Sequence, residues 1–129
     1  MAASLETFAT LAPCGRRVAV LGGMLELGAE SARLHRAVGR TVARLGVDLL
    51  VTVGEEARPL AAGVCVAGLT RVREVASAEH VVAVVVLRLA VGWTVLFKGS
   101  RGVRLERAHQ ATCARLAPTT SSAARRRAA

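Results

Sequence analysis

Short apolar segments that end at glycines alternate along this chain with segments of helical periodicity. The two clearest are RVAVLG at 17–22 and VDLLVTV at 47–53, and both are short and rich in β-branched residues. Continuous apolar strands that alternate with amphipathic helices pack as a mostly parallel sheet with helices on both faces. The sequence therefore predicts an α/β domain of three layers whose strands are joined by right-handed crossovers.

The remaining elements continue this alternation. We expect helices over residues 4–12, 28–45, 55–62 and 103–116, and further strands over residues 71–76 and 94–97. The apolar face of the second helix is predicted to comprise Leu34, Val38, Thr41 and Leu45, with Gly46 ending the helix. The thin apolar face of the last helix is predicted to comprise Leu105, Ala108, Thr112 and Leu116.

Residues 78–90 allow two interpretations. Their central segment VVAVVVL is strongly β-branched, which favours a strand. Their position between two expected strands, with Ser77 as a candidate N-cap, favours a helix. The residues alone leave this choice open.

The composition limits the class of protein. A chain of 129 residues with 53% apolar residues can bury a real core, and it is too apolar for a disordered chain. We expect one folded domain over residues 1–117 and a disordered basic tail over residues 118–129. No apolar run approaches the roughly 20 residues of a membrane-spanning helix, and Glu6 interrupts the N-terminus where a signal peptide is apolar. Three cysteines without a C-x-x-C pair favour a reducing compartment, so we expect a cytoplasmic location.

Two glycine-containing loops are candidates for binding. LGGMLELG at 21–28 follows the first strand and carries Glu26, and FKGSRG at 97–102 follows the last strand and carries Lys98, Ser100 and Arg101. Both loops would lie at the carboxyl edge of the sheet, where α/β proteins usually bind ligands. Cations and backbone amides at a helix start suit a phosphate or a carboxylate. Both loops also fit ordinary strand-to-helix connections.

The motifs of several common binding sites are absent from the sequence. Neither G-x-x-x-x-G-K-[ST] nor G-x-G-x-x-G occurs, so a P-loop and a dinucleotide fingerprint are both unsupported. The chain contains a single aspartate, Asp48, which argues against a magnesium site built wholly from this chain. No histidine or cysteine has partners at metal-ligand or nucleophile spacing, so we predict no metal ligand and no catalytic set. His109 is expected to be satisfied or half-buried, and Trp93 to cover the sheet edge.

A stripe of arginines follows one face of the second helix. It comprises Arg33, Arg36, Arg40 and Arg44, in a chain of net charge +9. Such a stripe is typical of a nucleic-acid surface and also of a solvated helix face. Aromatic stacking partners are scarce, which favours the solvated face.

The segments RRVAVLGGMLELGAESARLHRAVGR, LGVDLLVTVGEEAR, VREVASAE and VLFKGSRGVRLER together resemble the C-terminal domain of the Mur ligase family, over roughly residues 4–116. Within the family, LELG…ES…LH…VG and KGSRG…ER are most similar to the branch that joins D-alanyl-D-alanine to UDP-N-acetylmuramoyl-tripeptide. The resemblance implies a Rossmann-like domain that closes over a central ATPase domain, and it implies a helix over residues 78–90.

The resemblance also implies an activity: an ATP-dependent amide ligase of peptidoglycan, and so cell wall, biosynthesis. ATP and Mg²⁺ would be bound mainly by domains outside this chain. We therefore expect the chain alone to bind neither and to be inactive, with the missing N-terminal and central domains as its partners. Lys98, Ser100, Arg101 and Glu26 would bind substrate or phosphate at the closed site. A stand-alone α/β binding or interaction module derived from this domain is the alternative.

Three positions depart from the family pattern. Gly23 and Trp93 each stand where the family usually has Asp, and His109 stands where an apolar residue is usual. If the missing carboxylate at position 23 assists domain closure in the family, this chain has lost it.

Overall fold

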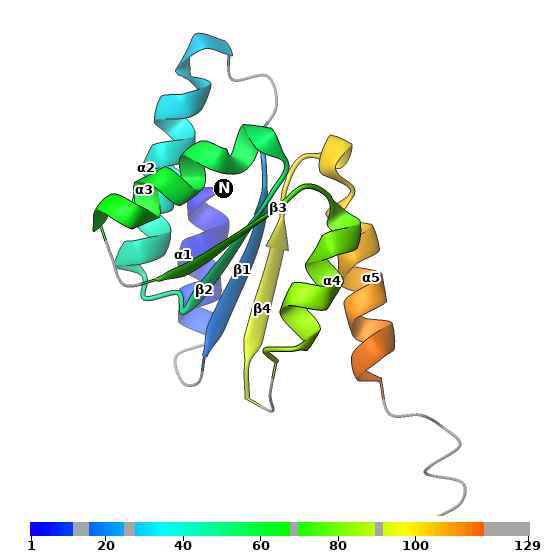
Figure 1. Ribbon diagram of the computed structural model, residues 1–129. Helices are drawn as coiled ribbons and strands as arrows, with labels where there is room; N and C mark the ends of the chain where they lie inside the picture. Colours follow the sequence, from blue (N-terminus) through cyan, green and yellow to red (C-terminus); the bar gives the residue numbers. More distant parts are fainter. Residues whose placement is uncertain (12–15, 25–27, 68–69, 90–91, 118–129) are drawn as a thin grey trace, which may run out of the picture.

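The computed structural model describes residues 1–11, 16–24, 28–67, 70–89 and 92–117. Within these ranges the sheet has strands β1 (Arg17–Gly22), β2 (Leu49–Val53), β3 (Arg71–Val75) and β4 (Thr94–Lys98). The strands are all parallel and lie in the order β3-β2-β1-β4 (Figure 1). The α/β class and the parallel sheet are confirmed.

Helices cover both faces of this sheet. On one face lie α1 (Ala2–Leu11), α2 (Ser31–Arg44) and α3 (Arg58–Ala67), and on the other lie α4 (Ala78–Val86) and α5 (Leu105–Leu116) (Figure 1). Short 3-10 turns, η1 (Gly28–Glu30), η2 (Glu55–Ala57) and η3 (Arg101–Val103), lead into α2, α3 and α5. The three-layer arrangement predicted from the alternation is therefore confirmed.

The central strand β1 supplies side chains to both layers of the core. Ala19 and Leu21 pack with the α1–α3 layer, whereas Val18 and Val20 pack with the α4–α5 layer, and all four are fully buried. Successive side chains of a strand point to opposite faces, so a strand covered on both faces must be apolar throughout. This requirement explains the unbroken apolar run in β1.

The contested segment forms helix α4. Val81 and Val85 pack against the sheet one helical turn apart, together with Ala78. Strand propensity is overridden because the chain has to cross from β3, at one edge of the sheet, to β4, at the other. A right-handed crossover between parallel strands is made most readily by a helix that buries one apolar face.

Helices α2 and α3 approach each other through two glycines. A Cβ atom on Gly39 would lie 2.1 Å from the carbonyl oxygen of Leu60, and one on Gly63 would lie 2.2 Å from that of Arg36. Real Cβ atoms are not found so close to backbone, so only glycine permits this contact. The two helices therefore pack backbone against backbone.

This contact corrects the predicted face of α2. The buried residues are His35, Val38, Gly39 and Val42. Leu34, Thr41 and Leu45 are only half-buried, because α2 turns its glycine toward α3. Gly46 has a φ of +70° and ends α2 as expected.

The extent of α3 and the buried face of α5 also differ from the expectation. Helix α3 is longer than residues 55–62, and Pro59 lies in its first turn, where a missing N–H costs no helical hydrogen bond. In α5, Leu105, Ala108 and Thr112 are buried as predicted, whereas Leu116 is half exposed. The tail predicted at 118–129 lies outside the described residues.

Candidate functional site

The two glycine loops meet at the carboxyl edge of the sheet. Leu21 of β1 is in register with Lys98 of β4, so both strands deliver their loops to the same level. The Ser100 N–H donates a hydrogen bond of 3.4 Å to the Gly23 carbonyl oxygen. A Cβ on Gly99 would lie 3.1 Å from the Gly22 Cα, so the two loops lie close together through their backbones.

This meeting point is the topological switch point of the sheet. Strand β1 leads to α2 on one face, and β4 leads to α5 on the opposite face (Figure 1). The two connections diverge to opposite faces, and the strand ends at such a point are the usual ligand site of open α/β sheets. The fold thus brings both predicted loops to the position where a ligand is expected.

Three of the four predicted binding residues line one pocket. Lys98, Ser100 and Arg101 border a cavity of about 500 Å³ between β4 and the start of α5. Glu106 and His109 lie in the same wall, and sequence reasoning did not place them there. Their signal was their spacing, because residues three apart share a helix face. The fourth predicted residue, Glu26, lies outside the described residues.

The Ser100 hydroxyl of this site lacks a hydrogen-bond partner within the chain's described residues. Its Oγ is also buried. A buried hydroxyl without a partner is costly in a folded protein and is uncommon. Ser100 therefore has an unused donor and acceptor, and its neighbour in the cavity lining, Lys98, is an exposed cation.

The backbone next to this pocket is strained. Arg104, directly after η3, has a φ of +54°, and it is the one non-glycine residue with positive φ in the described ranges. The left-handed conformation disfavours residues that carry a Cβ, at about 1–2 kcal/mol. Such strain concentrates at functional loops.

His35, on the buried side of α2, forms a hydrogen bond with the first glycine loop. Its side chain is fully buried, Nε2 accepts a hydrogen bond of 2.9 Å from the Met24 N–H, and Nδ1 lies 2.7 Å from the Ser31 carbonyl oxygen. These partners require a neutral ring with its proton on Nδ1. Sequence reasoning missed this role, although a histidine one turn after Ser31 on the core side of α2 was the available signal.

The space beside Gly23 is occupied by Glu56. A Cβ built on Gly23 would lie 2.8 Å from the Glu56 Cβ and 3.3 Å from its Oε2. The Glu56 side chain, from η2, therefore lies where a side chain at position 23 would begin.

The glutamate at the start of α4 lies at the same end of the sheet. The pKa of Glu79 is lowered below its ordinary value, first by a hydrogen bond from the Ser77 side chain and then by its own backbone N–H. With Arg104 and Arg107, it lines a smaller cavity of about 330 Å³. Its carboxylate therefore stays ionised beside the arginines.

Residues outside this edge behave as surface groups. The arginine stripe of α2 is exposed, with Arg33 paired to Glu30 and Arg44 paired to Glu6. His109, in the wall of the cavity beside Lys98, is exposed rather than half-buried. Its ring is nevertheless satisfied, the other expectation, because it meets Phe97 edge-on at 5.3 Å between ring centroids and its Nε2 lies 3.6 Å from the Cys113 Sγ.

The described residues contain no group of three His, Cys, Asp or Glu side chains that could hold a metal ion. Nor do they include a helix that is long and apolar enough to cross a membrane.

Together, the parallel sheet and the helices on both of its faces define a Rossmann-like α/β domain, whose carboxyl edge carries Lys98 and Arg101. The model of the Mur ligase, glutamate ligase domain family matches residues 1–101, and the chain belongs to this family. The chain is 32% identical over 114 residues to the UDP-N-acetylmuramoyl-tripeptide–D-alanyl-D-alanine ligase of Escherichia coli strain K12. That match covers 82% of this chain and 22% of the relative.

Solved structures share the fold. MurF ligase from Thermotoga maritima, in complex with ADP, matches with a TM-score of 0.69 and 24% identity over 86% of this chain and 25% of that one. MurF from Acinetobacter baumannii matches with a TM-score of 0.72 and 24% identity over 87% of this chain and 26% of that one. The chain thus spans about a quarter of the length of these relatives.

Proposed function

We propose that this chain is the C-terminal domain of an ATP-dependent amide ligase of peptidoglycan synthesis, which joins D-alanyl-D-alanine to UDP-N-acetylmuramoyl-tripeptide. In this proposal it closes over an active site whose ATPase and UDP-sugar domains lie outside the chain. The observation that carries the proposal is the contact of the two glycine loops at the switch point, beside Lys98 and the unpartnered Ser100 hydroxyl. The name of the Escherichia coli relative supports the choice of substrates.

The chemistry of the donor set favours an anionic group. Lys98 and Arg101 supply positive charge, and Ser100 supplies a hydroxyl, which suits a phosphate or a carboxylate. ATP, when bound, supplies the phosphoryl group that activates the substrate carboxylate. The residues of this chain would bind and orient the anionic groups and exclude water as the domain closes.

The described residues do not suit a magnesium ion. They contain no cluster of carboxylates, and the cavity beside Lys98 is lined by one acidic side chain, Glu106. Mg²⁺ prefers oxygen ligands, usually carboxylates together with substrate phosphates. We therefore propose that Mg²⁺ is held by the other domains, and that the isolated chain neither turns over ATP nor ligates.

A chimera tests the proposal. This chain would replace the corresponding C-terminal region of the Escherichia coli relative, and phosphate release would be measured with and without D-alanyl-D-alanine. The expected result is D-alanyl-D-alanine-dependent turnover that falls in Lys98→Ala by about two orders of magnitude, as for loss of one charge-stabilising contact. A folded chimera without such turnover would remove the proposal.

A matched variant separates the site from the general charge of the domain. Arg36→Ala also removes one cation, but from the exposed face of α2. Turnover is expected to be unchanged in this variant. Equal losses in both variants would show that net charge, rather than the switch-point edge, controls the reaction.

We also propose a cytoplasmic location. Both cysteines that the structure describes, Cys65 and Cys113, are free and exposed, which suits a reducing compartment.

A further inference from the structure

A second cationic pocket lies at the opposite, amino edge of the sheet. It has a volume of about 630 Å³ and is larger than the cavity beside Lys98. Arg16 precedes β1, Arg71 begins β3, Arg88 follows α4 and Trp93 precedes β4. Strand β4 alone separates the two edges by about 15 Å, at 3.3 Å per residue. The pocket is therefore distinct from the switch-point site.

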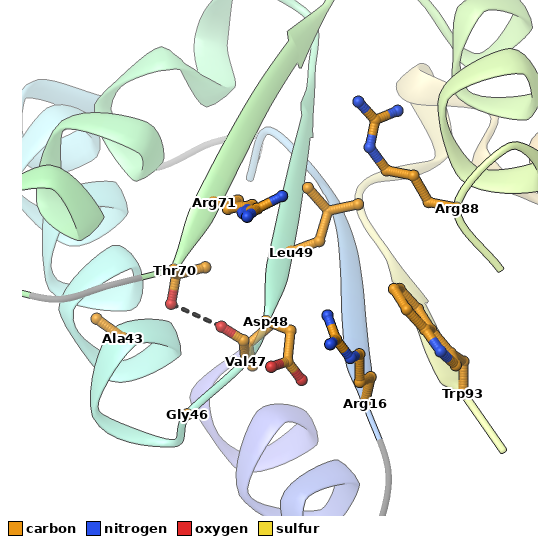
Figure 2. A pocket seen from close by; sticks show the side chains of 10 residues that line it. All are labelled: Arg16, Ala43, Gly46, Val47, Asp48, Leu49, Thr70, Arg71, Arg88 and Trp93. Atoms are coloured by element: carbon orange, nitrogen blue, oxygen red, sulfur yellow. Dashed lines mark hydrogen bonds between the residues drawn. The ribbon is translucent and has the colours of Figure 1, made fainter. Parts of the chain in front are cut away.

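The three guanidinium groups of this amino-edge pocket come from separate elements and border one cavity. Figure 2 shows those of Arg16, Arg71 and Arg88 around the side chain of Leu49, which forms an apolar floor. Leu49 and Arg71 are partners in the parallel ladder of β2 and β3, so both project to the same side of the sheet. The fold thus gathers positive charge that is scattered over more than 70 residues of sequence.

Intramolecular carboxylates do not neutralise this charge. Among the described residues, Arg16, Arg71 and Arg88 form no salt bridge; the ion pairs there involve other arginines. One carboxylate, Asp48, lines the pocket, and its Oδ2 accepts a hydrogen bond of 2.8 Å from the Arg17 N–H. The wall therefore carries three cations and one anion, and like charges held together favour an anionic ligand.

Trp93 adds an aromatic side chain to the lining of the amino-edge pocket. The Trp93 ring is half-buried, and the Arg16 guanidinium lies 5.4 Å from its centroid. This cation–π contact orients Arg16 at the pocket mouth. Arg88 is likewise held, because its Nη1 donates to the Val84 carbonyl oxygen at 3.3 Å. Two of the three cations are thus held in place by contacts within the chain.

We propose that the amino-edge pocket binds a compact polyphosphate anion, a pyrophosphate group either free or as part of a nucleotide. Guanidinium groups bind phosphate oxygens through paired hydrogen bonds, and three of them match the several charges of a pyrophosphate. The volume lies within the range of about 300–1,000 Å³ typical of small-molecule sites. An extended acidic peptide would need a longer surface than this concave site offers.

The sequence provides a direct probe of this pocket. Trp93 is the only tryptophan, and the chain has no tyrosine. Intrinsic tryptophan fluorescence of the full chain therefore reports on this wall. Titration with sodium pyrophosphate at constant ionic strength is expected to give a saturable change, weakened about tenfold or more in Arg71→Gln and in Arg88→Gln, because each loses a charge-assisted contact. Thermal denaturation of both variants verifies that they fold.

Two controls give the experiment its meaning. Arg36→Gln removes the same charge from an exposed helix face and should leave the titration unchanged, whereas an equal loss there would overturn the proposal in favour of general charge. Lys98→Ala should also leave it unchanged; sensitivity to Lys98 alone would assign the anion to the carboxyl edge and overturn the proposal.

Two further ligands identify the anion. ADP that binds more tightly than pyrophosphate would indicate a nucleotide that also uses the aromatic wall, and equal binding would indicate the free anion; both support the site. Citrate that binds more tightly than either, or no saturable change with any phosphate, would overturn it.

Discussion

The Met24 N–H donates a hydrogen bond of 2.9 Å to Nε2 of His35, a side chain without solvent exposure. The bond joins the glycine loop after β1 to the core of α2. Met24 follows Gly23, whose carbonyl oxygen accepts from the Ser100 N–H. The buried His35 ring therefore stabilises the part of the first glycine loop that contacts the second loop.

His35→Leu is expected to lower the free energy of unfolding by about 1–3 kcal/mol, because the Met24 N–H loses its acceptor in a half-buried place. Chemical denaturation measures this change. Gln110→Leu serves as the control: that side chain is exposed on α5, so its loss is expected to stay within about 0.5 kcal/mol. Equal effects of the two variants would contradict the role assigned to His35.

Gly39→Ala and Gly63→Ala are expected to be severe, at about 3 kcal/mol or more, because each new methyl group would meet backbone of the facing helix. The melting temperature and soluble yield measure the loss. Gly28→Ala provides the matched control, since Gly28 has a φ of +59° with no atom within 4 Å of a new Cβ. It should cost only the conformational term of about 1 kcal/mol. A mild Gly39→Ala would show that α2 and α3 can move apart.

Gly23→Asp is expected to destabilise the domain by about 1–3 kcal/mol, because its Cβ meets the Cβ of Glu56. A double-mutant cycle with Glu56→Gly tests this cause. The two changes should be coupled, so that Gly23→Asp costs less when Glu56 is absent. Strict additivity would show that Glu56 is not the obstacle.

Ser100→Ala is expected to leave the domain as stable or to stabilise it by about 1 kcal/mol, because it removes a buried hydroxyl that lacks a partner among the described residues. In the chimera the same change should reduce turnover. Calorimetry and phosphate release, measured on the same preparation, test the two halves together. A marked drop in melting temperature would mean that the hydroxyl serves the fold.

The carboxyl-edge loops were predictable because chain order and topology decide them. In a parallel sheet every strand ends at the same edge, so glycine loops that follow β1 and β4 must share it. Periodicity also identified Leu105, Ala108 and Thr112 as buried, since a helix places such residues on one face. These inferences depend on local spacing alone.

The amino-edge pocket and the α2–α3 contact were beyond such reasoning. Arg16, Arg71 and Arg88 are far apart in sequence and share a wall only because β3 and β1 flank β2. His35 and Gly39 are buried in α2, in place of the predicted Leu34 and Thr41. The reason is that α2 packs its backbone against that of α3.

By itself, the sequence determined the order and type of the elements, the three-layer class and the edge where the glycine loops meet. The tertiary structure alone decided which residues of α2 are buried, which side chain supports the loops and which distant cations border one pocket. The physical reason is that periodicity is a property of neighbours along the chain, whereas close packing and charge convergence depend on residues brought together by the fold.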